Sequence, residues 1–319
     1  MAHQILENDQ MFYLKNQVPW HGLGKEFKED RPATSQEALI YANLGWKVNK
    51  RPLVLARNGK TVDGHFEVYR EDTDYTLGIV GKSYTELQQA EAFSFFDAIV
   101  GDNQAIFHTA GSLFNGKVVW ILAKLPGDIK VSNDDCIEKY LLLTTSHDGS
   151  KAVQVMFTPT RVVCSNTLNI ALREGGNKVS IRHTSSVVEN LKQAHKLMGI
   201  TSKFYEEMGN VFNIFTKKAM NSKLLDQYID AVFKPEVKED EEEKEVNEYT
   251  RNTVIQLFES GKGNKGETLW DAFNGMTEFV DHHRKRGAKE VEKRFNSLIF
   301  GNGQQVKQKA YDEAFKLAA

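Results

Sequence analysis

The chain has 319 residues, of which 40% are hydrophobic and 26% are charged, enough for one large domain or two with a buried core. Its formal net charge of −2 excludes a global electrostatic attraction to nucleic acid or to a membrane surface. Two cysteines give no disulfide framework. The polar first residues and the absence of a long apolar run predict a cytoplasmic protein with no membrane partner.

The first hundred residues predict a helix followed by a hairpin and a second helix. The first helix is expected over Ser35–Leu44, with Thr34 or Ser35 as its cap. Asn58-Gly59 is typical of a tight hairpin turn. The strands expected beside this turn and after it are Pro52–Ala56, Thr61–Tyr69 and Tyr75–Val80, and the second helix is expected over Thr85–Val100.

The middle of the chain predicts two more hairpins. Asn115-Gly116 separates strands over Ile106–Phe114 and Lys117–Leu125, and His147-Asp148-Gly149-Ser150 separates strands over Tyr140–Thr145 and Ala152–Thr158. The continuous apolar run Val118–Ala123 indicates a central strand that is buried on both faces. Because the short connections are hairpin signals, we expect a largely antiparallel sheet of six or seven strands with helices packed on one side.

From Thr167 onward the spacing of apolar residues predicts helices. They are expected over Val187–Met198, Ser202–Met220 and Lys223–Phe233, with Gly199 as a separator, and again after Leu269 and towards Leu317. The predicted fold class is therefore α+β, with the sheet followed by a helical C-terminal half. The predicted domains are an N-terminal arm at 1–50, an α+β core at 51–200 and a helical region at 201–319, with an acidic linker at 235–248.

Several motifs, in order along the chain, resemble one known family. They are VPWHGLG (18–24), TAGSLFNGKVVWILAKL (109–125), SHDGS with TPTRVVCSNTL, IRHTSS (181–186), TLWDAFNGMTEFVDHHR (268–284) and FGNGQQVKQKA (300–310). The chain resembles the phage/plasmid-like protein family, a group of phage and mobile-element proteins classed as a domain of unknown function. The resemblance covers nearly the whole chain except the acidic segment near residue 240. It implies no named activity.

The polar residues around the 147–150 turn are the first candidates for chemistry. His147, Asp148 and Asn166 predict a ligand-contact loop, although Asp148-Gly149 also serves simply as the turn and Asn166 as a helix cap. An oriented base formed by His147 and Asp148 is the third alternative. Cys164 is interpreted as a buried structural cysteine. We assign no catalytic residue.

Neither a metal site nor a phosphate-binding loop is predicted. Asp281-His282-His283 lacks the His-x-x-x-His spacing, and His283 falls on the apolar face of its helix as a core histidine. The loop Gly261–Gly266 lacks the Gly-x-x-x-x-Gly-Lys-Ser/Thr pattern and is interpreted as a linker. With no dinucleotide, triad or kinase signature either, the sequence favours a non-enzymatic protein without cofactors.

The charge distribution points towards nucleic acid. Residues 236–248 hold eight acids against two lysines, whereas residues 284–309 hold eight bases against two acids, interleaved with Phe295 and Phe300. More basic residues lie near the 147–150 hairpin. The residues predicted to contact nucleic acid are Lys151, Arg161, Arg182, Arg284, Arg286, Lys289 and Lys293.

The leading hypothesis is a non-enzymatic phage or mobile-element protein of the host cytoplasm that binds single-stranded DNA, as in annealing, replication or recombination. It is expected to form a homo-oligomer. One alternative is a structural or self-assembling protein without affinity for nucleic acid, and another is a metal-dependent hydrolase or nuclease that uses His147 and Asp148.

Overall fold

The computed structural model describes residues 11–15, 25–100, 106–131, 135–161, 166–167, 178–193, 198–234, 245–284, 297–298 and 301–319. The chain forms two compact units. The first unit comprises residues 1–126, 140–157 and 178–201, and the second comprises residues 127–139, 158–177 and 202–319. The predicted division into an arm, a core and a helical region remains a prediction.

The first unit contains the main antiparallel sheet and a smaller one. The larger sheet has the order β2-β1-β6-β7-β8 within this unit, and β9 pairs with both β8 and β12. Its strands are β1 (Met11–Leu14), β2 (Lys25–Phe27), β6 (Ile106–Leu113), β7 (Val118–Lys130), β8 (Cys136–Ser146), β9 (Val153–Phe157) and β12 (Lys178–Ile181). Strands β1 and β2 pair in parallel, and the other strand pairs found within the described residues are antiparallel. Strands β7 and β8 continue along the chain into the second unit.

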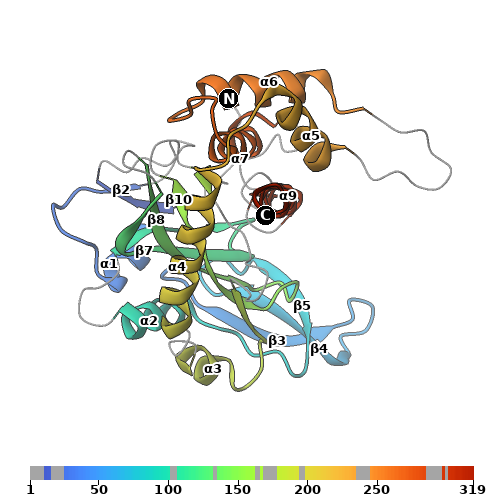
Figure 1. The fold of residues 1–319 in the computed structure, drawn as a ribbon. Helices are drawn as coiled ribbons and strands as arrows, with labels where there is room; N and C mark the ends of the chain where they lie inside the picture. Colours follow the sequence, from blue (N-terminus) through green and yellow to red (C-terminus); the bar gives the residue numbers. More distant parts are fainter. Residues whose placement is uncertain are drawn as a thin grey trace. The chain divides into compact units, whose positions relative to one another are not determined.

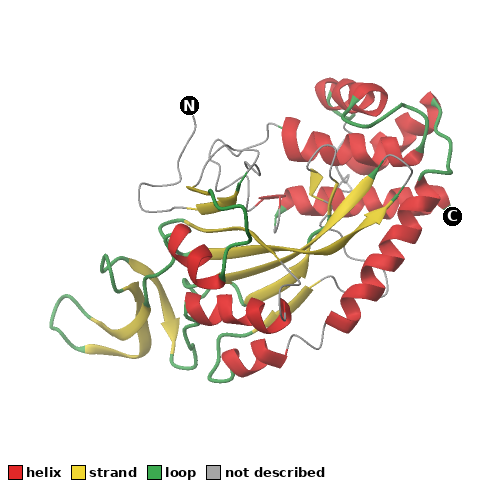
Figure 2. Cartoon of the chain, turned by 90° about the vertical axis from the view of Figure 1, so that its left-hand side faces the viewer, coloured by secondary structure: helices red, strands yellow, loops and turns green. Residues whose placement is uncertain are grey.

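The smaller sheet of the first unit has three antiparallel strands (Figure 1). They are β3 (Val48–Val54), β4 (Thr61–Arg70) and β5 (Thr76–Gly81). The helices of this unit are α1 (Ser35–Tyr41), α2 (Gln89–Val100) and α3 (Val187–Gln193). Figure 2 shows these short helices in front of the larger sheet. The predicted fold class, an α+β protein with a largely antiparallel sheet, is confirmed.

The predicted central strand is confirmed. In the larger sheet, β7 lies between β6 and β8, and five of the six residues in 118–123 are buried. The turn at Asn115-Gly116 is also confirmed, because Phe114, Asn115 and Gly116 all have positive φ, as a tight turn of this kind requires.

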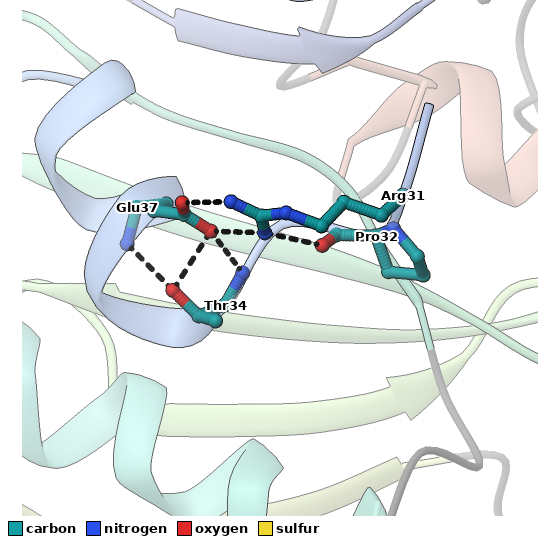
Figure 3. A network of polar contacts seen from close by, with 4 residues as sticks. All are labelled: Arg31, Pro32, Thr34 and Glu37. Atoms are coloured by element: carbon teal, nitrogen blue, oxygen red, sulfur yellow. Dashed lines mark hydrogen bonds and ion pairs between the residues drawn. The ribbon is translucent and has the colours of Figure 1, made fainter. Parts of the chain in front are cut away.

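The start of helix α1 shows how the local sequence sets one of these boundaries (Figure 3). The Thr34 hydroxyl accepts a hydrogen bond from the Glu37 backbone N–H at 3.2 Å, and the Glu37 carboxylate accepts one from the Thr34 backbone N–H at 2.9 Å. Arg31 donates two further hydrogen bonds to Glu37. These contacts lower the pKa of Glu37 to about 2, and the hydrogen bonds from Arg31 have the largest effect. Thr34 is therefore the N-cap of a complete capping box.

Helix α2 begins later than predicted. The expected helix starts at Thr85, whereas α2 starts at Gln89. The Gln88 side chain instead bonds the backbone of Val48 on β3, accepting from its N–H at 3.1 Å and donating to its carbonyl at 2.8 Å. This contact pairs the backbone groups of Val48, and α2 begins at the residue after Gln88.

The prediction that the chain is helical from Thr167 is wrong. Asn166–Thr167 forms β11 and pairs with β10 (Thr160–Arg161) in the second unit, and Lys178–Ile181 forms β12 in the first. The β-branched Thr167 and the alternating Val179 and Ile181 suit strands, and the ladder bonds of β10 replace the expected helix cap. Among the described residues the larger sheet consequently has nine strands, more than the six or seven expected.

The second unit is mainly helical. Its helices are α4 (Met198–Phe215, which starts in the first unit), α5 (Ser222–Phe233), α6 (Glu248–Ser260), α7 (Leu269–Glu278), a π-helical turn (Phe279–His283) and α9 (Asn302–Ala318). Gly199 lies inside α4, so its predicted role as a separator is wrong; one glycine in a first turn costs too little to stop a helix. The predicted helical C-terminal half is confirmed.

An aromatic cluster and a buried ion pair hold the helices of the second unit together. Phe212 of α4 lies 4.8 Å from Trp270 and 5.8 Å from Phe273 of α7, measured between ring centroids. Lys307 of α9 donates to the Asp281 carboxylate at 2.8 Å, and both side chains are at most 4% exposed. Lys307 is one of the eight bases counted in residues 284–309. Because it is buried, it does not contribute to a solvated basic surface.

We expect Thr34→Ala to lower the free energy of unfolding by about 1 kcal/mol, because the Glu37 N–H loses its partner at the helix start. Urea denaturation measures the change. Thr73→Ala is the matched control, because the Thr73 hydroxyl makes only a 3.5 Å contact with Asp72. Equal stabilities of the two variants would contradict this role of the capping box.

Lys307→Met should destabilise the protein by about 3–5 kcal/mol, since it leaves the Asp281 carboxylate buried without its cation. Lys309→Met, two residues further along the same helix, should change stability by less than about 0.5 kcal/mol. The additional substitution Asp281→Leu should recover part of the loss. Denaturant midpoints of the three variants test this, and a Lys307→Met protein as stable as its control would refute it.

Candidate functional site

A pocket of about 380 Å³ lies in the first unit, where three segments from different parts of the chain meet. The segments are the end of β5 with the turn after it, the hairpin between β8 and β9, and the residues that follow β12. The lining residues are Ile79, Val80, Gly81, Ser83, Tyr84, Gly149, Lys151, Ala152, Arg182, His183 and Thr184. We take this pocket as the candidate functional site, because it collects several polar and cationic side chains in one concave place.

Strand register brings the hairpin and the residues after β12 together. Strand β12 pairs antiparallel with β9, with Ile181 opposite Val153. The next residue outward on each strand is Arg182 on one and Ala152 on the other, so Arg182 lies beside the segment that carries Lys151. This pairing explains how two residues 31 positions apart line one pocket.

A network of side-chain to backbone bonds fixes the hairpin turn. The Asp148 carboxylate accepts hydrogen bonds from the Ser146 hydroxyl and from the Ser150 backbone N–H, both at 2.8 Å. The Ser146 hydroxyl oxygen in turn accepts from the Lys151 backbone N–H at 3.0 Å. Gly149 has a φ of 75°, which confirms the predicted turn. The turn therefore holds the Lys151 backbone in a defined place.

Strand β5 closes on this turn at Gly78. A Cβ atom at position 78 would lie 2.6 Å from the Asp148 Cα, a distance at which the two backbones would have to separate. Only glycine allows this approach. The pocket wall formed by Ile79 and Val80 follows directly from Gly78 along β5.

His183 and Tyr84 form an inner wall of the pocket. Their rings stack with centroids 4.8 Å apart. His183 Nδ1 lies 3.2 Å from the Thr85 carbonyl oxygen. Because a carbonyl oxygen can only accept, Nδ1 is the donor. In the neutral ring, Nε2 then accepts from the Thr145 hydroxyl at 3.3 Å. The Tyr84 hydroxyl donates to the Ser146 carbonyl at 3.2 Å. Burial lowers the pKa of His183 and raises the pKa of Tyr84.

The two cations of the pocket differ in environment. Arg182 is exposed and has no ion pair with any residue in the described part of the chain. Lys151 is half-buried, and burial lowers the pKa of its ammonium group, although the attraction of Asp148 partly opposes this effect. An anion in the pocket would compensate the cost of burying the Lys151 charge.

The residues predicted to contact nucleic acid fall into three groups. Lys151 and Arg182 line the pocket. Arg284 lies in the second unit, directly after the π-helical turn, where its N–H donates to the Phe279 carbonyl at 2.8 Å. The others lie outside the described residues or have side chains that do; these are Arg161, Arg286, Lys289 and Lys293.

The predicted ligand-contact loop is placed only in part. His147 is 0% exposed, with its Nε2 3.4 Å from Gln89 Nε2 and its ring edge-on to Trp46, so it faces the interior. Asp148 lies at the turn, and no hydrogen bond joins these two residues, so the geometry gives no support to an oriented base. The side chain of Asn166 and all of Cys164 lie outside the described residues.

The other sequence features have structural roles in the described part of the chain. No group of three or more metal-ligating side chains occurs there. The Gly261–Gly266 loop connects α6 to α7, and Asn264 donates to the carbonyls of Leu257 and Asp271. His283 is only partly buried at the end of the π-helical turn, whereas it was predicted as a core histidine.

Sequence reasoning missed the pocket walls Ser83, Tyr84 and Thr184. The available signal was the segment Ile181–Ser186, which carries Arg182, His183 and Thr184 and is one of the motifs of the family resemblance. Because this segment lies more than 30 residues from the hairpin in sequence, the sequence alone did not indicate that the two lie side by side.

The site and the fold together define an α+β protein with a cationic pocket beside a β-hairpin. Residues 76–300 match the family described as "Domain of unknown function (DUF932)", and this range includes every residue that lines the pocket. The match covers more than half of the chain, so the protein belongs to this family. No curated protein and no solved structure matches the chain. None of the helices in the described ranges is long and apolar enough to cross a membrane.

Acid should destabilise the first unit through His147. Burial, with repulsion from His183, lowers the pKa of His147 to about 3, whereas the unfolded chain restores its ordinary value of about 6.5. Between these values the unfolded state binds a proton that the folded state does not, so stability is complete above this window and falls as pH decreases. The full loss through the window is on the order of 5 kcal/mol.

Urea denaturation at a series of pH values between 4 and 7.5 measures this effect. His147→Gln should flatten the dependence of the unfolding free energy on pH. His65→Gln, which changes an exposed histidine on β4, should leave the dependence as in the parent. Identical pH profiles for the parent and His147→Gln would show that His147 is not the group that titrates.

Proposed function

We propose that this protein binds single-stranded nucleic acid without catalysing a reaction, and that its pocket contacts the phosphates. The observation that carries the proposal is the meeting of Lys151 and Arg182, from separate segments, in one pocket. Arg182 presents a planar fork of donors that matches phosphate oxygens, and Lys151 adds a compact positive charge.

The local charge, rather than the net charge, supports this proposal. The whole chain carries −2, so association depends on a cationic patch and is screened by salt. The patch belongs to the family region at residues 76–300. The hydrolase alternative receives no support, because His147 is buried away from solvent.

The biological setting is part of the same proposal. We propose a role in the DNA metabolism of phages or mobile elements, such as annealing, replication or recombination, in the cytoplasm of the host cell and as a homo-oligomer. The order of the motifs that resemble the phage/plasmid-like family supports this setting. The basic residues Arg284, Arg286, Lys289 and Lys293, which the sequence analysis predicted to contact nucleic acid, are part of the same proposal.

Fluorescence anisotropy with a labelled single-stranded oligonucleotide over a salt series tests the proposal. The logarithm of the binding constant should fall linearly with the logarithm of the salt concentration, and each lost phosphate contact should reduce the slope by about 0.7. Lys151→Gln and Arg182→Gln should each weaken binding at low salt. The matched controls Lys60→Gln and Arg57→Gln remove exposed charges of the first unit that lie outside the pocket, and should bind like the parent.

Two results would overturn the proposal. One is the absence of binding even at low salt. The other is binding by the Lys151→Gln and Arg182→Gln double variant with the affinity and salt slope of the parent, provided that melting curves show the variant to be folded. Because Arg182 is exposed, its substitution should have little effect on folding.

A further inference from the structure

We infer that the pocket holds a single nucleotide at the end of a strand and recognises its terminal phosphate monoester. This inference rests on the proposed function and narrows it. It assigns a specific ligand to the pocket, whereas the proposal above requires only contact with phosphates.

The size of the pocket sets the first limit. A volume of about 380 Å³ lies at the lower end of the roughly 300–1,000 Å³ that small-molecule sites occupy. Sites that track a single strand without regard to its ends extend over about 4–16 nucleotides per domain. The pocket therefore suits one nucleotide, and the remainder of a strand would lie outside it.

The charge of the pocket sets the second limit. A phosphate monoester carries about −1.5 to −2 at pH 7, whereas an internal phosphodiester carries a single negative charge. The pocket supplies two cations, Lys151 and Arg182. Asp148 attracts Lys151 but is not among the residues that line the pocket, so no carboxylate contributes to the lining itself. A dianionic end group therefore matches the pocket better than an internal phosphate does.

The donors and the apolar surface fit the two halves of a nucleotide. Ser83, Thr184 and Arg182 are among the lining residues, and the hydroxyl and guanidinium groups of these residue types donate to phosphate oxygens. Ile79 and Val80 of β5 supply apolar surface in the same pocket, and Ile79 is 56% exposed. An exposed aliphatic side chain beside a cationic site can cover the apolar surface of a base or a sugar, and inorganic phosphate has no such surface.

A competition experiment tests the inference with the full-length protein. A labelled oligonucleotide with hydroxyl groups at both ends is displaced by unlabelled strands of the same sequence that carry a 5′-phosphate, a 3′-phosphate or no terminal phosphate. One of the two phosphorylated strands should bind about tenfold more tightly than the strand with hydroxyl ends, as expected for charge-assisted hydrogen bonds. The end that gives the preference identifies the polarity of the strand.

Calorimetry with small probes separates the two halves of the ligand. We expect dAMP to bind more tightly than inorganic phosphate, and deoxyadenosine to give no measurable binding. Arg182→Gln should remove the preference for a terminal phosphate. Ile79→Ser should weaken the binding of dAMP and leave the binding of inorganic phosphate unchanged. The control Val54→Ser, at a similarly exposed apolar position on β3, should not change the affinity for either probe.

The outcomes distinguish this inference from the proposed function. Equal affinities for all three strands would overturn the inference and leave the proposed function intact. Failure of every strand to bind would overturn the proposed function, and the strand-end inference with it, even if dAMP bound. A terminal-phosphate preference that persists in the Arg182→Gln variant would place the recognition outside this pocket.

Discussion

The arrangement of the first unit depends on one close contact, between Gly78 of β5 and the backbone of Asp148 in the hairpin turn. The small sheet β3-β4-β5 reaches the hairpin of the larger sheet at this point, and a side chain at position 78 would separate them. The contact places Ile79 and Val80 next to Lys151 and so forms the pocket wall. The pocket thus results from the packing of two sheets, and neither sheet forms it alone.

Burial gives neighbouring residues of the hairpin different roles. His147 is enclosed with Trp46 and Gln89, and its neutral form is the one that the interior tolerates. Lys151, after the turn, is only half-buried and keeps its charge near solvent. On one side of the turn His147 is therefore packed in the interior, and on the other side Lys151 contributes a cation to the pocket.

Local signals predicted much of this structure, and long-range pairing accounts for what they missed. The turn residues Asn115-Gly116 and Asp148-Gly149 act through their own backbone preferences, so sequence alone located these hairpins. The pairing of Ile181 with Val153 depends on residues far apart in the chain, and without it Arg182 could not be placed in a pocket with Lys151. Lys307 shows the same limit, since its burial depends on Asp281 from another element.

The proposed function requires that the pocket between β5 and the hairpin be the phosphate site. Its most direct test is the change in backbone amide chemical shifts on titration with dAMP. The largest changes should occur at Ser83, Lys151, Arg182 and Thr184, whereas Arg57 and Lys60 of the same unit should not respond. Saturable changes centred elsewhere in the chain, with none at these four residues, would contradict it.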